Sequence, residues 1–128
     1  MEFSNLHFGN NSFKEFLNCI QDKNVVLFGA GHYGKLALDD LSSITQISYF
    51  IDNDPWKWDT TIHGIDVRPP SYLLNKEMDK AVVLIASLYV FEAEELLIEM
   101  GVKHYFSYVL FFDRAAEKMD RIGLILPL

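Results

Sequence analysis

Short apolar runs alternate with amphipathic segments along this chain, and this pattern predicts its secondary structure. Continuous apolar runs are typical of strands buried on both faces of a sheet, whereas apolar residues three and four positions apart indicate helices. The runs predict strands over residues 25–28, 47–51, 65–67, 81–86 and 104–109. The amphipathic segments predict helices over residues 12–22, 35–41, 71–74, 89–100 and 113–121.

Strands that alternate with helices predict a parallel sheet covered by helices on both faces. Right-handed crossovers favour the strand order 3-2-1-4-5. The predicted fold class is therefore α/β, a doubly wound, Rossmann-like sheet of five parallel strands. We expect residues 1–128 to form a single domain, because a chain of 128 residues can bury one core but has no room for a second lobe.

A glycine-rich turn separates the first predicted strand from the helix that follows it. Gly29, Gly31 and Gly34 form a G-x-G-x-x-G pattern, and the next apolar run ends in Asp52. This order of strand, turn, helix, strand and acid is the dinucleotide-binding fingerprint. Gly29 would permit the tight turn, Gly31 would admit a pyrophosphate, and Gly34 would allow helix and strand to pack closely. The alternative is a β-turn-α connection that keeps this geometry and binds nothing.

Besides the glycines, five residues are candidates for cofactor binding. Asp52 would accept hydrogen bonds from a ribose, and Asn53 follows it in the same turn. His32 lies in the glycine turn, where it either faces a phosphate or points to solvent. Tyr33 either packs under the turn, which we favour, or stacks on a base. Ser87 follows the fourth predicted strand, where it either contacts the ligand or caps the next helix.

Composition narrows the classes of partner and site. The formal net charge of −7 and the scattered basic residues predict that no nucleic acid is bound. Cys19 is the single cysteine and reads as a small buried hydrophobe, and the histidines have no metal-ligand spacing, so we expect no metal site. The N-terminus lacks the pattern of a signal peptide, and no apolar run is long enough to span a membrane. These features predict a cytoplasmic protein.

Several segments resemble one group of bacterial proteins. GAGHYGK, FIDNDPWK, IHGIDVRPPSYL and VVLIAS follow the pattern of small Rossmann-like domains in surface-polysaccharide biosynthesis, over about residues 24–108. Such domains are the N-terminal nucleotide-sugar-binding parts of sugar O-acyltransferases and of nucleotide-sugar dehydratases and epimerases. The resemblance implies a nucleotide-sugar or NAD(H) as ligand. Trp58 and Asp66 depart from the pattern, because the family usually has a glycine and a proline near these positions.

The sequence offers little support for catalysis by this chain alone. Tyr72 and Lys76 form a Y-x-x-x-K pair like that of short-chain dehydrogenases, but they follow the third predicted strand, where we consider the pair a coincidence. No hexapeptide repeat is present to carry acyl transfer. We therefore predict no catalytic residue and an accessory, non-catalytic nucleotide-binding domain in surface-glycan synthesis. The alternatives are a small NAD-dependent nucleotide-sugar reductase or dehydratase, and a protein-interaction module without a ligand.

The C-terminal residues suggest self-association. Phe111, Phe112, Ala115, Met119 and Ile122 recur at helical spacing, and an apolar tail follows them. A large exposed apolar surface usually marks a contact site. We expect a homodimer formed through this segment, with folding back onto the sheet as the alternative.

Overall fold

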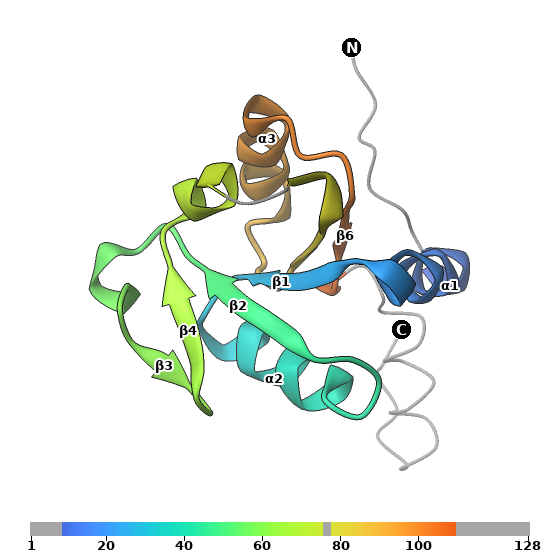
Figure 1. The fold of residues 1–128 in the computed structure, drawn as a ribbon, viewed down its shortest axis with the longest axis horizontal. Helices are drawn as coiled ribbons and strands as arrows, with labels where there is room; N and C mark the ends of the chain where they lie inside the picture. Colours follow the sequence, from blue (N-terminus) through green and yellow to red (C-terminus); the bar gives the residue numbers. More distant parts are fainter. Residues whose placement is uncertain (1–8, 76–77, 110–128) are drawn as a thin grey trace, which may run out of the picture.

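A six-stranded sheet is the centre of the molecule. The computed structural model describes residues 9–75 and 78–109. The order of the strands is β3-β4-β2-β1-β5-β6 (Figure 1). The strands are β1 Asn24–Phe28, β2 Ile47–Ile51, β3 Thr61–Ile62, β4 Ile65–Arg68, β5 Ala81–Ile85 and β6 Tyr105–Ser107. The helices are α1 Gly9–Cys19, α2 His32–Leu41 and α3 Val90–Met100, with 3-10 turns η1 Ile20–Asp22, η2 Pro55–Lys57, η3 Pro70–Asn75 and η4 Met78–Lys80.

The predicted five-stranded sheet is wrong in its strand count and order. Strands β4, β2, β1, β5 and β6 are parallel neighbours, but β3 pairs antiparallel with the outer edge of β4. His63 and Gly64 connect β3 to β4, both with positive φ, at 49° and 80°. This is the geometry of a two-residue type I′ hairpin turn. The apolar runs of the sequence do not predict this edge strand.

The strands bury side chains on both faces of the sheet, as their continuous apolar runs predict. Alternate residues of a strand point to opposite faces. Val25 and Leu27 pack with Phe16 of α1 and with α2, while Val26 and Phe28 pack with α3. Figure 1 shows α2 and α3 on opposite sides of the sheet. The core thus consists of two apolar layers that hold β1 at the centre.

The helix ends differ from the predictions in detail. Helix α1 begins at Gly9, three residues before the predicted start at residue 12. Gly101 ends α3 in the left-handed conformation, and its N–H donates to carbonyls of the last turn, as a glycine C-cap does. The segment predicted as a short helix over 71–74 is the 3-10 turn η3. The helix predicted over 113–121 and the apolar tail lie outside the described residues.

Within residues 9–75 and 78–109, no helix combines the length and apolar character needed to cross a bilayer.

Candidate functional site

The glycine turn leaves the carboxyl end of the central strand β1, and its tight packing requires two of its glycines. Gly29 has φ of 126°, and a Cβ there would lie 2.4 Å from the carbonyl oxygen of Ala86. A Cβ on Gly34 would lie 1.9 Å from the carbonyl oxygen of Gly29. Side chains at either position would collide with backbone, so Gly29 and Gly34 let β1, β5 and α2 approach one another.

Gly31 is different, because its surroundings are open. It is the N-cap of α2, with ordinary negative φ. Of the groups that the structure describes beyond its own neighbours, only the Lys57 Nζ lies within 4 Å of the position of a Cβ, at 3.4 Å. The backbone there can receive a ligand group directly against the first N–H groups of α2. Such N–H groups and the helix dipole favour an anion.

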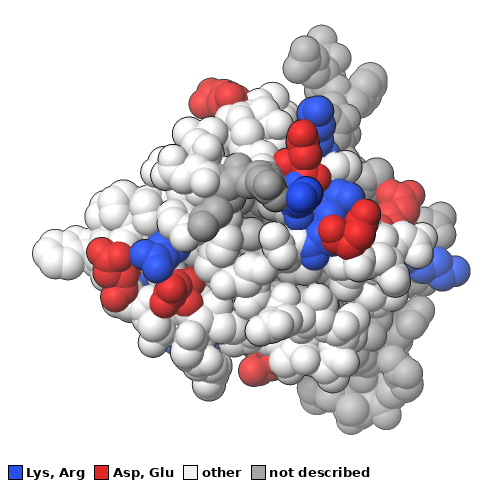
Figure 2. Space-filling model, viewed as in Figure 1, with Lys and Arg blue, Asp and Glu red and all other residues white. Residues whose placement is uncertain are grey.

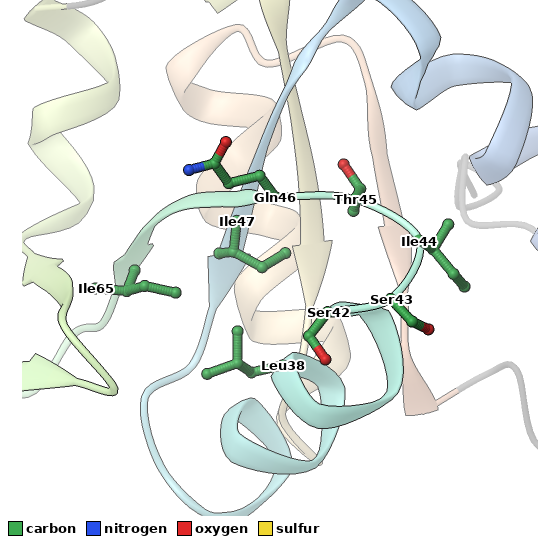
Figure 3. A pocket seen from close by; sticks show the side chains of 8 residues that line it. All are labelled: Leu38, Ser42, Ser43, Ile44, Thr45, Gln46, Ile47 and Ile65. Atoms are coloured by element: carbon green, nitrogen blue, oxygen red, sulfur yellow. The ribbon is translucent and has the colours of Figure 1, made fainter.

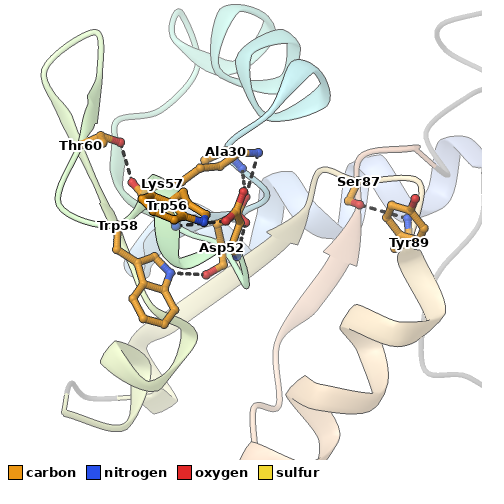
Figure 4. Close-up of polar contacts among 9 residues, drawn as sticks. Ala30, Asp52, Trp56, Lys57, Trp58, Thr60, Ser87 and Tyr89 are labelled. Carbon is orange, nitrogen blue, oxygen red and sulfur yellow. Dashed lines mark hydrogen bonds and ion pairs between the residues drawn. The ribbon is translucent and has the colours of Figure 1, made fainter.

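Asp52 connects the glycine turn to the loop that follows β2. Its Oδ2 accepts a hydrogen bond from the backbone N–H of Ala30, and its Oδ1 accepts one from the N–H of Asp54, both at 2.8 Å (Figure 4). The side chain is only 13% exposed. Each carboxylate oxygen can still accept a second hydrogen bond. Asp52 is therefore both a structural acceptor and a candidate ligand for a hydroxyl group.

The loop after β2 is fixed by its own hydrogen bonds. Asp54 caps η2 by accepting the Trp56 N–H at 3.0 Å. The indole N–H of Trp58 donates to the carbonyl oxygen of Asp52 at 2.6 Å. The hydroxyl of Thr60 donates to the carbonyl oxygen of Lys57 at 2.6 Å. These contacts bring the Lys57 ammonium to 3.8 Å from Asp52 Oδ2.

A cavity of about 300 Å³ lies beside this loop, between the ends of β1, β2 and β5. From β1 the chain adds β2 and β4 on one side of the sheet and then β5 and β6 on the other, so the strand order reverses between β1 and β5. Ligands of open α/β sheets bind at such a point. The lining residues are Phe28, Gly29, Asp52, Asn53, Ser87, Tyr89, Glu92 and Ala93. The cavity therefore combines the ends of three strands with the first turn of α3.

A larger cavity, of about 390 Å³, lies at the opposite end of β2 (Figure 3). Its lining runs from Leu38 through the turn at 42–46 to Ile47, and Ile65 completes it. It contains no charged side chain and is distant from the carboxyl ends of the strands. We therefore place the candidate site at the smaller cavity.

The structure brings four of the eight predicted site residues together at one cavity. Gly29, Asp52, Asn53 and Ser87 line one cavity. Ser87 Oγ accepts a hydrogen bond from the N–H of Tyr89 at 3.0 Å and so fixes the start of α3. This contact is similar to the helix-capping role given above as the alternative for Ser87. Their roles in cofactor binding stay predictions.

The other four, Gly31, His32, Tyr33 and Gly34, belong to the glycine turn and the first turn of α2. His32 is exposed there, and its ring contacts that of Tyr33 edge-on at 5.4 Å between centroids. Tyr33 is partly buried against both core layers, which fits packing under the turn.

Sequence reasoning missed Lys57 and Tyr89. Lys57 belongs to the FIDNDPWK segment, so a basic residue soon after the acid was a visible signal. The sequence predicts Tyr89 only as the start of a helix, yet its side chain lines the cavity and the residue is 74% exposed. Its position next to Ser87, at the end of β5, was the signal for it.

Other candidates lie away from the cavity. Tyr72 belongs to η3, where its ring meets that of Tyr49 edge-on and the Arg68 guanidinium lies over it. Its predicted partner Lys76 lies outside the described residues. Burial raises the pKa of the partly buried Cys19 thiol. Across the part of the chain that the structure describes, no cluster of His, Cys, Asp or Glu fits a metal ion.

Comparison with known sequences identifies a relative among transcriptional repressors. No protein-family model matches the chain. Over 99 residues it is 33% identical to the redox-sensing transcriptional repressor Rex of Desulfitobacterium hafniense, a match that covers 70% of this chain and 46% of the repressor. The chain thus spans about half the length of that relative.

Two solved structures are similar in fold. A UDP-D-quinovosamine 4-dehydrogenase from Vibrio fischeri has a TM-score of 0.56 and 25% identity, over 76% of this chain and 86% of that one. RSP, a Rex-family repressor, has a TM-score of 0.57 and 16% identity, over 77% of this chain and 50% of that one. The chain has the fold of a Rossmann-like nucleotide-binding domain. The resemblance to polysaccharide-biosynthesis domains is supported at that level only.

The expectation that nucleic acid is excluded as a partner is wrong. A relative with 33% identity is a transcriptional repressor, a class of protein that acts at DNA. The expectation rested on net charge, which describes this chain but says nothing of the larger part of the repressor that lies outside the match. On the face shown in Figure 2, basic side chains lie beside acidic ones. Charge balance in one domain cannot exclude a nucleic-acid partner for the whole protein.

Proposed function

We propose that this domain binds a nicotinamide adenine dinucleotide, NAD(H), in the cavity at the carboxyl ends of β1, β2 and β5. The open face of Gly31 beside Asp52 is the observation that carries the proposal. A redox-sensing repressor and a dehydrogenase are both similar to this chain, and both names denote redox functions. Dinucleotides are the redox carriers that this fold typically holds.

The pyrophosphate and one ribose of a dinucleotide would each find a complementary group in the site. The pyrophosphate would lie against Gly31 and the first N–H groups of α2, where His32 is also exposed. Tyr33 would support the turn from below. A ribose hydroxyl would add to the hydrogen bonds that Asp52 already accepts. Asn53 and Ser87 would contact the part of the ligand that enters the cavity. An acid at position 52 disfavours a 2′-phosphate, so NADP(H) should bind more weakly.

A nucleotide-sugar is the second candidate ligand. The similar dehydrogenase from Vibrio fischeri acts on a UDP-sugar according to its name, and the match covers 86% of its chain. Together with the sequence resemblance, this supports a role in surface-glycan synthesis as the alternative. The same cavity and the same glycine turn would then hold the diphosphate of the sugar donor.

Calorimetric titration with NAD⁺, NADH, NADP⁺ and UDP-sugars separates these candidates. The proposal predicts that NAD⁺ or NADH binds at least tenfold more tightly than NADP⁺ and UDP-sugars. Tighter binding of a UDP-sugar would support the second candidate instead. A chain that binds none of them at millimolar concentration would be an interaction module without a nucleotide.

A redox-sensing role would require, in addition, that the affinities for NAD⁺ and NADH differ. A ligand shifts a conformational equilibrium only if its affinity differs between the two states. A sensor of the NAD⁺/NADH ratio must therefore distinguish the oxidised from the reduced form. Equal affinities for NAD⁺ and NADH would argue against sensing while leaving dinucleotide binding intact.

A further inference from the structure

Lys57 is the cation that the described residues place over the glycine turn. Its Nζ lies 3.4 Å from the position that a Cβ of Gly31 would occupy, and 3.8 Å from Asp52 Oδ2. The side chain is 40% exposed, so the ammonium is accessible to a ligand. It therefore stands beside Gly31, where the turn is open to an approaching group.

The position of Lys57 follows from its backbone. Lys57 ends η2, and its N–H donates to the carbonyl oxygen of Asp54 at 3.0 Å. Its own carbonyl oxygen accepts the hydroxyl of Thr60 at 2.6 Å. Trp58, the next residue, is tied by its indole to the carbonyl oxygen of Asp52. Hydrogen bonds on either side thus hold the base of the Lys57 side chain next to the turn, which lowers the entropic cost of using it.

We propose that Lys57 binds the diphosphate of the ligand and determines the preference of the site for diphosphate esters. This proposal rests on the proposed function. A backbone N–H cradle supplies only partial charges, whereas an ammonium supplies a full charge and strong hydrogen bonds to phosphate oxygens. When the ligand enters, the ammonium exchanges its long contact with Asp52 for a contact with a phosphate oxygen. The Asp52 carboxylate is then available to a ribose hydroxyl. The ligand class is a nucleoside diphosphate ester, whether dinucleotide or nucleotide-sugar.

The test compares NADH with ADP, AMP and adenosine, three ligands that differ from one another only in phosphate content. Binding of NADH, ADP, AMP and adenosine is measured for the wild-type chain, for Lys57→Gln and for Lys57→Arg. Lys103→Gln is the matched control, because Lys103 also faces an aspartate at 3.8 Å but contacts Asp79 at another part of the surface. Circular dichroism and thermal unfolding verify that each variant is folded.

The proposal predicts that Lys57→Gln weakens NADH and ADP by about tenfold or more and leaves adenosine within about twofold, because only the former lose a charged hydrogen bond. Lys57→Arg should restore most of the affinity, and Lys103→Gln should change nothing. If NADH and ADP bind to Lys57→Gln as they do to the wild type, the role of Lys57 is refuted while the proposed function stands. An equal loss for adenosine would show a structural role instead. A wild-type chain that binds none of the ligands would refute the proposed function itself.

Discussion

The side chain of Asp52 accepts the backbone N–H of Ala30 at 2.8 Å, although the two residues belong to different loops. Ala30 is 6% exposed, so its N–H has little access to water. The second carboxylate oxygen accepts the N–H of Asp54 at the same distance. The acid of the fingerprint therefore contributes to the fold before any ligand binds. Loss of binding in an Asp52 variant must be separated from loss of structure.

Replacing Asp52 should cost stability as well as affinity. Asp52→Ala leaves two backbone donors without their acceptor, and we expect the free energy of unfolding to fall by about 2 kcal/mol. Asp52→Asn keeps one oxygen acceptor and should lose about half as much. Urea denaturation followed by circular dichroism measures both. Asp66→Ala, which removes an exposed carboxylate on β4, is the control and should change stability by less than about 1 kcal/mol. An unchanged midpoint in Asp52→Ala would contradict the structural role.

Alanine at two glycines of the turn should separate folding from binding. Gly34→Ala places a Cβ 1.9 Å from a backbone oxygen and should destabilise the chain by about 3 kcal/mol or more. Among the described residues, the new methyl group of Gly31→Ala meets only the Lys57 ammonium, at 3.4 Å, and the change should cost about 1 kcal/mol or less, as a change at an N-cap. Gly31→Ala should nevertheless reduce NADH affinity by tenfold or more, because the methyl group occupies the approach to the backbone. Thermal unfolding and calorimetry on the same samples test both statements. A stable Gly34→Ala variant would disprove the packing argument.

Tyr49 should make stability fall at high pH. Burial, and secondly the nearby Tyr72, raises the pKa of Tyr49 to about 12 from an ordinary value of 10. Between these values the unfolded chain releases the phenol proton while the folded chain keeps it, so stability decreases as pH rises through this range. Below pH 10 the contribution is fully present.

Denaturation of wild type and Tyr49→Phe at several pH values isolates this effect. The stability of wild type relative to Tyr49→Phe should be constant below pH 10 and should fall toward pH 12. Tyr89→Phe removes an exposed phenol and serves as the control. A constant difference across the whole range would show that Tyr49 titrates alike in both states.

Trp58 should report on the loop that carries Lys57. Trp58→Phe removes the indole donor to Asp52 and should lower stability by about 1 kcal/mol. The remaining Trp56 is 91% exposed, so its fluorescence should be strongly quenched by acrylamide. In Trp56→Phe, the half-buried Trp58 should be quenched less. Equal quenching of the two variants would contradict the fixed loop.

The sequence predicted the features that depend on local pattern. The continuous apolar runs identified all five parallel strands, because burial on both faces leaves few polar positions in β1 or β5. The glycine turn was identified because Gly29 and Gly34 have backbone roles that no other residue can fill. Asp52 was identified from its distance to this turn.

The features that were missed depend on pairing and loop contacts that leave no periodic pattern in the sequence. Strand β3 has only two residues, too few for periodicity, and it exists because β4 pairs with it across the His63–Gly64 turn. Lys57 reaches Gly31 only because Asp54 and Trp58 fold the loop into η2. Net charge gave the wrong prediction about nucleic acid. It describes this chain alone and says nothing of the part of the repressor that lies outside the match.

The short strand β3 also affects whether the edge of the sheet can pair with another chain. An exposed strand edge presents unpaired N–H and C=O groups and invites another chain to add a strand, which is a route to aggregation. Here the outer edge of β4 is paired, and the new margin is two residues long and closed by a tight turn. Asp59 and Asp66, both paired with Arg68, add charge beside it. Such a margin is a poor template, so this side of the sheet resists intermolecular strand exchange while the cavity at the carboxyl ends stays open to ligands.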